Sequence, residues 1–260
     1  MTPGPAVLEV TGLTRSFGGL VAVSDVTFSV HEGEIVGLIG PNGAGKTTVF
    51  NMVAGSLEPT TGSIRFQGAD VSGLAAHERA GLGIARTFQI TSIFPALTTR
   101  ENVRAATHRI TKAGWLQAMV RSAAWHHEEA EIDRLAQETL EFCGLAAKAD
   151  VRAAGLSYGE QRRLEVAIAL ATKPTLLLLD EPAAGLNPEE GQRLVAMIRQ
   201  VRDRGVTVLL VEHHMRVVMG VCDRIIVLDH GARIAAGTPR EVAQSPEVIR
   251  VYLGREVAHA

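Results

Sequence analysis

Short apolar runs, separated by glycines and polar turns, occupy both ends of the chain. They predict strands over residues 7–10, 26–30, 35–39, 62–68, 82–85, 175–179, 206–211, 224–228 and 233–236. The four successive leucines at 176–179 show no alternation, which is typical of a parallel strand buried on both faces. Helices are predicted over 48–54, 157–171 and 239–253, so these two parts of the chain indicate an α/β core.

The middle of the chain follows a different pattern. Between residues 95 and 156 the strand-like runs stop, and apolar residues recur at helical spacing over 99–110, 115–124 and 128–143. One face of the last segment is apolar and consists of Ile132, Leu135, Ala136, Leu140 and Cys143. We therefore expect a single domain over 1–260, in which a helical subdomain at about 95–156 is inserted into a core of 1–94 and 157–260.

Composition argues against several classes of protein. Hydrophobic residues make up 46% of the 260 residues, which argues against disorder, and the formal net charge of −2 gives no basic field for nucleic acid. The sequence has no apolar stretch of about 18 residues and no signal-peptide core. Cys143 and Cys222 lie far apart and are expected to be reduced, while His126 and His127 have no convergent ligands and are expected to be solvated. We expect an intracellular protein.

The segment 40–48 carries the first chemical signal. Its residues fit the phosphate-loop pattern G-x-x-x-x-G-K-[ST], between a predicted strand and a predicted helix. In such a loop the glycines let backbone N–H groups point at phosphate oxygens, the lysine contacts the terminal phosphates, and the hydroxyl ligates Mg²⁺. The candidate phosphate-binding residues are Gly40, Pro41, Asn42, Gly43, Ala44, Gly45, Lys46, Thr47 and Thr48.

Charged residues follow two of the buried strands. Asp180 ends the leucine run and can hold Mg²⁺, and Glu181 can orient and polarise an attacking water molecule. A pair of surface acids is the alternative interpretation. A histidine just past the strand 206–211 can reach a γ-phosphate, but local physics does not separate His213 from His214.

Three further positions are ambiguous from local sequence. Phe17 lies among turn residues and can either stack on a purine or pack within the loop. Gln89 follows a predicted strand, where α/β sheets tend to place ligand contacts. Ser157 and Glu160 form a capping-box pattern, which by itself indicates only a well-capped helix.

The phosphate loop, Gln89, the segment 156–161, the acid pair and His213 occur in the order and spacing of the ATP-binding-cassette ATPases. The chain resembles this family over nearly its whole length. The resemblance implies a phosphate-loop ATPase core, with a mixed sheet flanked by helices, an antiparallel β subdomain and an inserted helical subdomain. It also implies ATP and Mg²⁺ as ligands, and two cassettes that face each other head to tail around two ATP molecules.

The same resemblance assigns roles to individual residues. Glu181 would be the catalytic base, Lys46 would act with it, and His213 would be the switch histidine, because it matches the family's Glu-His-[Asp]-Met run with His214 at the Asp place. Phe17 would stack on adenine. Mg²⁺ would be bound or sensed by Thr47, Gln89 and Asp180. The signature segment, which acts on the partner's ATP, would be Ser157, Tyr158, Gly159 and Glu160.

Several segments look like the ATPase subunits of importers for branched-chain, or hydrophobic, amino acids. They are residues 86–89, 156–165, 180–188 and 251–254. The signature departs from the commonest Leu-Ser-Gly-Gly-Gln at Tyr158 and Glu160, and Asn187 stands where most cassettes carry Asp, so we assign Asn187 no catalytic role. The long helical insert and the tyrosine-bearing signature resemble the larger of the two ATPases in such importers.

The resemblance also implies partners. These are a second ATPase subunit (a heterodimer in the complex, with a homodimer possible in isolation), two membrane permease subunits and, indirectly, a periplasmic binding protein, with no nucleic acid. It places the chain at the cytoplasmic face of a bacterial-type inner membrane, bound through the permeases. Two alternatives stay open: a cassette for lipopolysaccharide or lipid export, and a soluble cassette that acts on DNA or ribosomes. The cargo and the choice between ATP and GTP also stay open.

Overall fold

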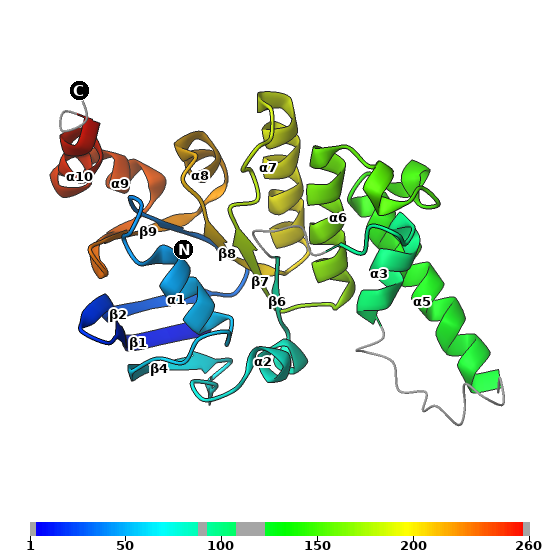
Figure 1. The fold of residues 1–260 in the computed structure, drawn as a ribbon, viewed down its shortest axis with the longest axis horizontal. Coiled ribbons are helices and arrows are strands. Elements are labelled where there is room, and N and C mark those ends of the chain that lie inside the picture. Colours follow the sequence, from blue (N-terminus) through cyan, green and yellow to red (C-terminus); the bar gives the residue numbers. More distant parts are fainter. Residues whose placement is uncertain (1–3, 88–92, 108–122, 257–260) are drawn as a thin grey trace. The chain divides into compact units, whose positions relative to one another are not determined.

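The computed structural model describes residues 4–87, 93–107 and 123–256, which Figure 1 draws in colour. The chain divides into two compact units. The first unit is 1–86 with 175–260, and the second is 87–174. The second unit is longer than the helical subdomain expected at 95–156, because the helix after residue 157 belongs to it. Arg163 of that helix donates to the backbone carbonyls of Cys143 and Gly144, at 3.2 and 3.1 Å, which ties the helix to the insert.

The first unit contains an antiparallel sheet of four strands in the order β2-β1-β4-β5 (Figure 1). The strands are β1 (Ala6–Phe17), β2 (Leu20–His31), β4 (Thr61–Phe66) and β5 (Ala69–Asp70). Strand β1 is three times as long as the run 7–10 predicts. Its polar second half pairs with both β2 and β4 across several register shifts, so sheet hydrogen bonds extend the strand beyond its apolar part.

A second, mixed sheet of six strands has the order β10-β9-β3-β8-β7-β6. Its members are β3 (Ile35–Ile39), β6 (Ile84–Arg86), β7 (Leu176–Asp180), β8 (Thr207–Val211), β9 (Arg224–Asp229) and β10 (Ala232–Gly237). All pairs are parallel except β10 with β9, and every residue of β3, β7 and β8 is buried. Because β3, β8 and β7 are adjacent and parallel, the loops that follow them leave from one edge of the sheet.

Helices of the first unit are α1 (Lys46–Val53), α2 (Ala76–Leu82), α7 (Pro188–Asp203), α8 (Met215–Val221), α9 (Pro239–Gln244) and α10 (Pro246–Glu256). The single helix predicted over 239–253 is two helices, because Pro246 has no N–H to continue α9 and instead starts α10. The prediction missed α2, which is short and buries only Arg79. Among the described residues, no helix is both long enough and apolar enough to cross a membrane.

The second unit is helical, with α3 (Thr99–Thr107), α5 (Ala123–Phe142), α6 (Tyr158–Ala171) and short turns at Ala146–Lys148 and Ala153–Gly155. Of the apolar face predicted over 128–143, Ile132, Ala136 and Leu140 of α5 are buried, as is Cys143 just after the helix, and Leu135 is half-buried. Most of the predicted helix 115–124 lies outside the described residues. The mixed sheet, the antiparallel sheet and the helical insert confirm the predicted fold class.

Candidate active site

The phosphate-loop residues connect β3 to α1 and need glycine at two points. Gly40 has φ +152°, and a Cβ there would lie 2.2 Å from the carbonyl oxygen of Leu228. Gly45 has φ +94°, and its Cβ would lie 2.7 Å from the carbonyl oxygen of Ala22. The loop therefore packs backbone against backbone, and α1 starts at Gly45 without a side-chain cap, as at helix N-termini that bind phosphate.

Lys46 is the first residue of α1 and is only 7% exposed. Its ammonium group donates to the carbonyl oxygens of Gly40 and Pro41, at 2.7 and 3.0 Å. Burial lowers the pKa of Lys46 from its ordinary value, and the carboxylate of Glu181 acts in the opposite direction. The structure thus holds a cation against the start of the phosphate loop, in electrostatic range of the acid after β7.

Asp180 ends β7 and is 3% exposed. Burial raises the pKa of its carboxyl, and the neighbouring Arg86 lowers it. Arg86, at the end of the adjacent strand β6, donates to the Asp180 carboxylate at 3.2 Å and to Asn51 of α1 at 2.7 Å. The buried carboxylate therefore has the cation that its burial requires, and the sequence prediction had not assigned this role to Arg86.

Glu181 follows directly and has a left-handed backbone, with φ +46°. Its N–H donates to the carbonyl oxygen of Val211 on β8, at 2.9 Å, which fixes the turn. Nδ1 of His213 lies 3.5 Å from a carboxylate oxygen of Glu181, whose side chain is 24% exposed. The structure therefore brings Glu181 and His213 together, whereas Nδ1 of His214 lies 3.1 Å from Glu212.

Glu212 is a residue that the sequence analysis missed. It is fully buried, and one carboxylate oxygen accepts the Ala183 N–H at 2.9 Å. The other oxygen accepts the N–H groups of His213 and His214, both at 2.9 Å, and contacts Nδ1 of His214 at 3.1 Å. Ligand atoms of Glu212, His213 and His214 lie within 4.8 Å of one another, but the Glu212 carboxylate already serves these donors, so we describe a hydrogen-bond network rather than a metal site.

The remaining predicted residues have simpler surroundings. Phe17 is 46% exposed at the end of β1, with the Arg15 guanidinium 4.7 Å from its ring centroid. Asn42, Gly43 and Thr47 are exposed, and Pro41 and Thr48 are half-buried. Gln89 lies outside the described residues.

The predicted signature residues belong to the second unit. Ser157 and Glu160 form a reciprocal capping box at the start of α6, with hydrogen bonds of 2.8 and 3.3 Å. The bond from the Ser157 N–H lowers the pKa of Glu160. Gly159 is buried, and the exposed Tyr158 accepts hydrogen bonds from Arg162. The start of this helix was therefore predicted correctly.

A lysine held in a glycine loop between strand and helix, with acids at the end of another parallel strand of the same sheet, defines a phosphate-loop nucleoside triphosphatase. Sequence comparison narrows this class. The profile of the family described as ABC transporter matches residues 23–184, and that described as branched-chain amino acid ATP-binding cassette transporter matches residues 232–258. The chain belongs to the ATP-binding-cassette transporter family, and it is an ATP hydrolase of that type.

Individual relatives cover almost the whole chain. The high-affinity branched-chain amino acid transport ATP-binding protein BraF of Pseudomonas aeruginosa is 46% identical over 95% of this chain and 98% of its own length. The lipopolysaccharide export system ATP-binding protein LptB of Acidithiobacillus ferridurans is 38% identical over 95% and 97%. Among solved structures, the ADP conformation of the cassette MJ1267 has a TM-score of 0.84 and 29% identity, covering 96% of this chain and 99% of that one.

Proposed function

We propose that this chain is the ATP-binding and ATP-hydrolysing subunit that powers an importer of branched-chain, or hydrophobic, amino acids. One observation supports the assignment of the cargo. Residues 232–258 match the branched-chain profile, in addition to the match of residues 23–184 to the general cassette profile. The higher identity to the branched-chain transport protein than to the lipopolysaccharide export protein supports the same choice.

In this proposal the two units together form one cassette over residues 1–260. Residues 40–48 bind the phosphates of ATP, with Lys46 at the terminal phosphates, and Phe17 stacks on adenine. Glu181 takes the proton of the attacking water, and His213, which lies 3.5 Å away, contacts the γ-phosphate.

Oxygen ligands suit Mg²⁺, and this site supplies them at Thr47 and Asp180. The buried carboxylate of Asp180 lies at the same edge of the sheet as the phosphate loop and is linked to α1 through Arg86, and it fits a hard cation. Gln89 is proposed as a further Mg²⁺ contact from its place in the sequence. When bound, Mg²⁺ would neutralise charge on the phosphates.

The proposal also includes the partners. Ser157, Tyr158, Gly159 and Glu160 contact ATP held by a second ATPase subunit, and ATP binding closes the two cassettes. Two permease subunits hold the chain at the cytoplasmic face of the inner membrane, and a periplasmic protein delivers the cargo to them.

Uptake of radiolabelled leucine tests the cargo directly. Cells that lack the chromosomal copy are complemented with the wild-type chain or with Glu181→Gln, and initial uptake rates are compared. We expect wild-type complementation to restore uptake and the variant to fail although it is expressed and membrane-bound. If leucine uptake is independent of the chain while lipopolysaccharide transport depends on it, the export function replaces this proposal.

A further inference from the structure

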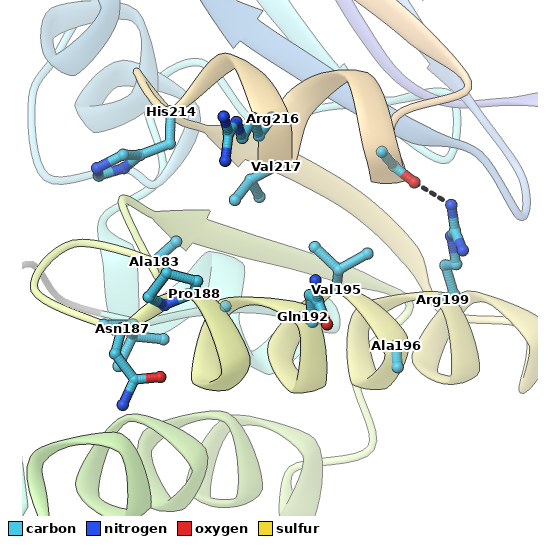
Figure 2. Close-up of a pocket in the computed structure, with 13 residues that line it drawn as sticks. Ala183, Asn187, Pro188, Gln192, Val195, Ala196, Arg199, His214, Arg216 and Val217 are labelled. Carbon is cyan, nitrogen blue, oxygen red and sulfur yellow. Dashed lines mark hydrogen bonds between the residues drawn. The ribbon is translucent and has the colours of Figure 1, made fainter.

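A cavity of about 560 Å³ lies in the first unit between α7, α8 and the loop that follows Glu181 (Figure 2). Its volume falls within the range of small-molecule sites, about 300–1,000 Å³. Figure 2 shows α8 on one side, carrying Arg216 and Val217, and α7 on the other, carrying Gln192 and Val195. Arg199 of α7 donates to the carbonyl oxygen of Gly220 on α8 and connects the two helices at one end of the cavity.

The lining combines cationic, amide and apolar side chains: Arg199 and Arg216 are its arginines, and Asn187 and Gln192 are its amides. Arg216 is exposed, and the described part of the chain provides no hydrogen bond or ion pair for its side chain. His214 also lines the cavity, and none of the described lining residues is acidic. Leu186, Val195 and Val217 contribute apolar surface. Such a lining matches an anion with an aliphatic body, and it offers no acidic partner for an ammonium group.

The cavity shares two residues with the network around the hydrolytic pair. Ala183 and His214 line it, and both donate their N–H groups to the buried carboxylate of Glu212. The oxygen that accepts from His214 also accepts the N–H of His213, whose ring lies 3.5 Å from Glu181, while Ala183 donates to the other oxygen. An anion at His214 would compete with Glu212 for the ring nitrogen, whose 3.1 Å contact is one of those that hold the loop carrying His213.

We propose that this cavity binds a small aliphatic carboxylate and that binding lowers the rate of ATP hydrolysis. Arg216 holds the carboxylate, and the aliphatic chain lies against the apolar residues of α7 and α8. Whether the cavity binds a carboxylate does not depend on which cargo the importer carries. The effect of binding on ATP hydrolysis rests on the proposed role of Glu181 as the base. Because the ligand acts through loop position rather than by occupying the phosphate loop, it lowers kcat and leaves KM for ATP unchanged.

Binding is tested by calorimetry on the full chain with octanoate as the probe. Octanamide has the same tail without the charge, and octylamine has the opposite charge. Gly191→Leu fills the cavity, since a Cβ at this α7 position meets no atom within 4 Å, and Arg216→Gln removes the charge. Matched controls outside the cavity are Gln200→Leu, also on α7, and Arg193→Gln, an exposed arginine of α7.

We expect octanoate to bind wild type and both controls alike, and at least tenfold more weakly to Gly191→Leu and to Arg216→Gln. Octanamide and octylamine should bind at least tenfold more weakly than octanoate. Equal binding of octanoate to wild type and Gly191→Leu overturns the site, and equal binding of octanoate and octanamide overturns the carboxylate assignment. The two variants act through volume and charge separately, so a folding defect in one leaves the other as the test.

Regulation is measured as steady-state ATPase activity of the complex purified with its membrane partners. Saturating octanoate should lower kcat at least twofold in wild type and leave the two cavity variants unchanged. Unchanged kcat in an active wild-type complex overturns the regulatory effect. A complex that does not hydrolyse ATP even without octanoate contradicts the proposed function instead, so the two failures are distinguishable.

Discussion

Replacing Glu212 with glutamine tests whether one buried carboxylate holds the loops on both sides of the hydrolytic pair. One carboxylate oxygen of Glu212 accepts the Ala183 N–H, and the other accepts the N–H groups of His213 and His214, all at 2.9 Å. Glutamine supplies a single oxygen acceptor, so its NH₂ group must face at least one of these donors. The mildest arrangement keeps the two histidine bonds and loses the bond to Ala183.

The structure sets the size of the effect. A hydrogen bond to a charged acceptor contributes about 1.5–3 kcal/mol, and leaving a buried N–H unpaired costs about 1–3 kcal/mol. Both figures describe the loss of the same hydrogen bond to the Ala183 N–H, so they are not added together. Removal of the buried charge offsets part of this loss in stability. We expect Glu212→Gln to lower the free energy of unfolding by about 2 kcal/mol. The loop after Glu181 then loses its anchor, so kcat should fall about tenfold, which equals about 1.4 kcal/mol in the barrier, with KM for ATP unchanged.

Urea unfolding followed by circular dichroism gives the stability, and steady-state ATPase assays give kcat and KM. Glu189→Gln is the matched control, because Glu189 lies on α7, its side chain is 73% exposed, and it pairs only with the exposed Arg193 among the described residues. The control should stay within about 0.5 kcal/mol of wild type. If Glu212→Gln retains both wild-type stability and wild-type kcat, the reasoning about this network is wrong.

Four further predictions follow from other parts of the structure. Glu181→Gln should retain ATP binding, lose turnover and form a stable ATP-bound dimer, which gel filtration and ATPase assays measure; normal hydrolysis would exclude Glu181 as the base. Arg79→Met should lower the free energy of unfolding by about 3–5 kcal/mol in urea titrations, because the guanidinium is 1% exposed and donates to four backbone carbonyls, and a change below 1 kcal/mol would contradict this role. Tyr252→Phe should raise KM for ATP by up to about tenfold, since the half-buried phenol of Tyr252 of α10 lies near the backbone of Gly40 at the phosphate loop, and an unchanged KM would argue against that link. The thiol of Cys222 should resist alkylation in the folded chain at pH 8 and react in denaturant, because burial raises its pKa to about 12; rapid labelling of the folded chain would contradict this.

Patterns that depend on neighbouring residues were predictable from the sequence. The all-apolar run 35–39 coincides with β3, and the capping pattern at 157–160 marks the start of α6. Both depend on interactions within a few residues, namely burial of consecutive side chains and bonds between a side chain and the next turn. The glycine loop between β3 and α1 was predictable for the same reason.

Contacts between distant segments were not predictable in this way. Arg86 and Asp180 are 94 residues apart and meet only because β6 and β7 are neighbours in the sheet. Glu212 directly precedes the two histidines, and its contacts with Ala183, 29 residues earlier in the chain, are not visible in the sequence. An acidic residue immediately after a fully buried strand is the signal that could have identified Glu212, because a buried charge there needs several donors to be stable.

The C-terminal end of helix α1, opposite the phosphate loop, is also held in place by the fold. At its N-terminus, Gly45 and Lys46 belong to the loop; at its C-terminus, Arg79 of α2 donates to the carbonyl oxygens of Met52 and Val53. A buried cation at a helix C-terminus satisfies unpaired carbonyls and interacts favourably with the helix dipole. Burial lowers the pKa of Arg79, yet four carbonyl acceptors keep the charged form in place. Since α1 is only eight residues long, we expect a displacement at its C-terminus to move the phosphate loop as well. Arg79→Met should therefore weaken ATP binding as well as stability, although Arg79 lies at the opposite end of the helix from the loop.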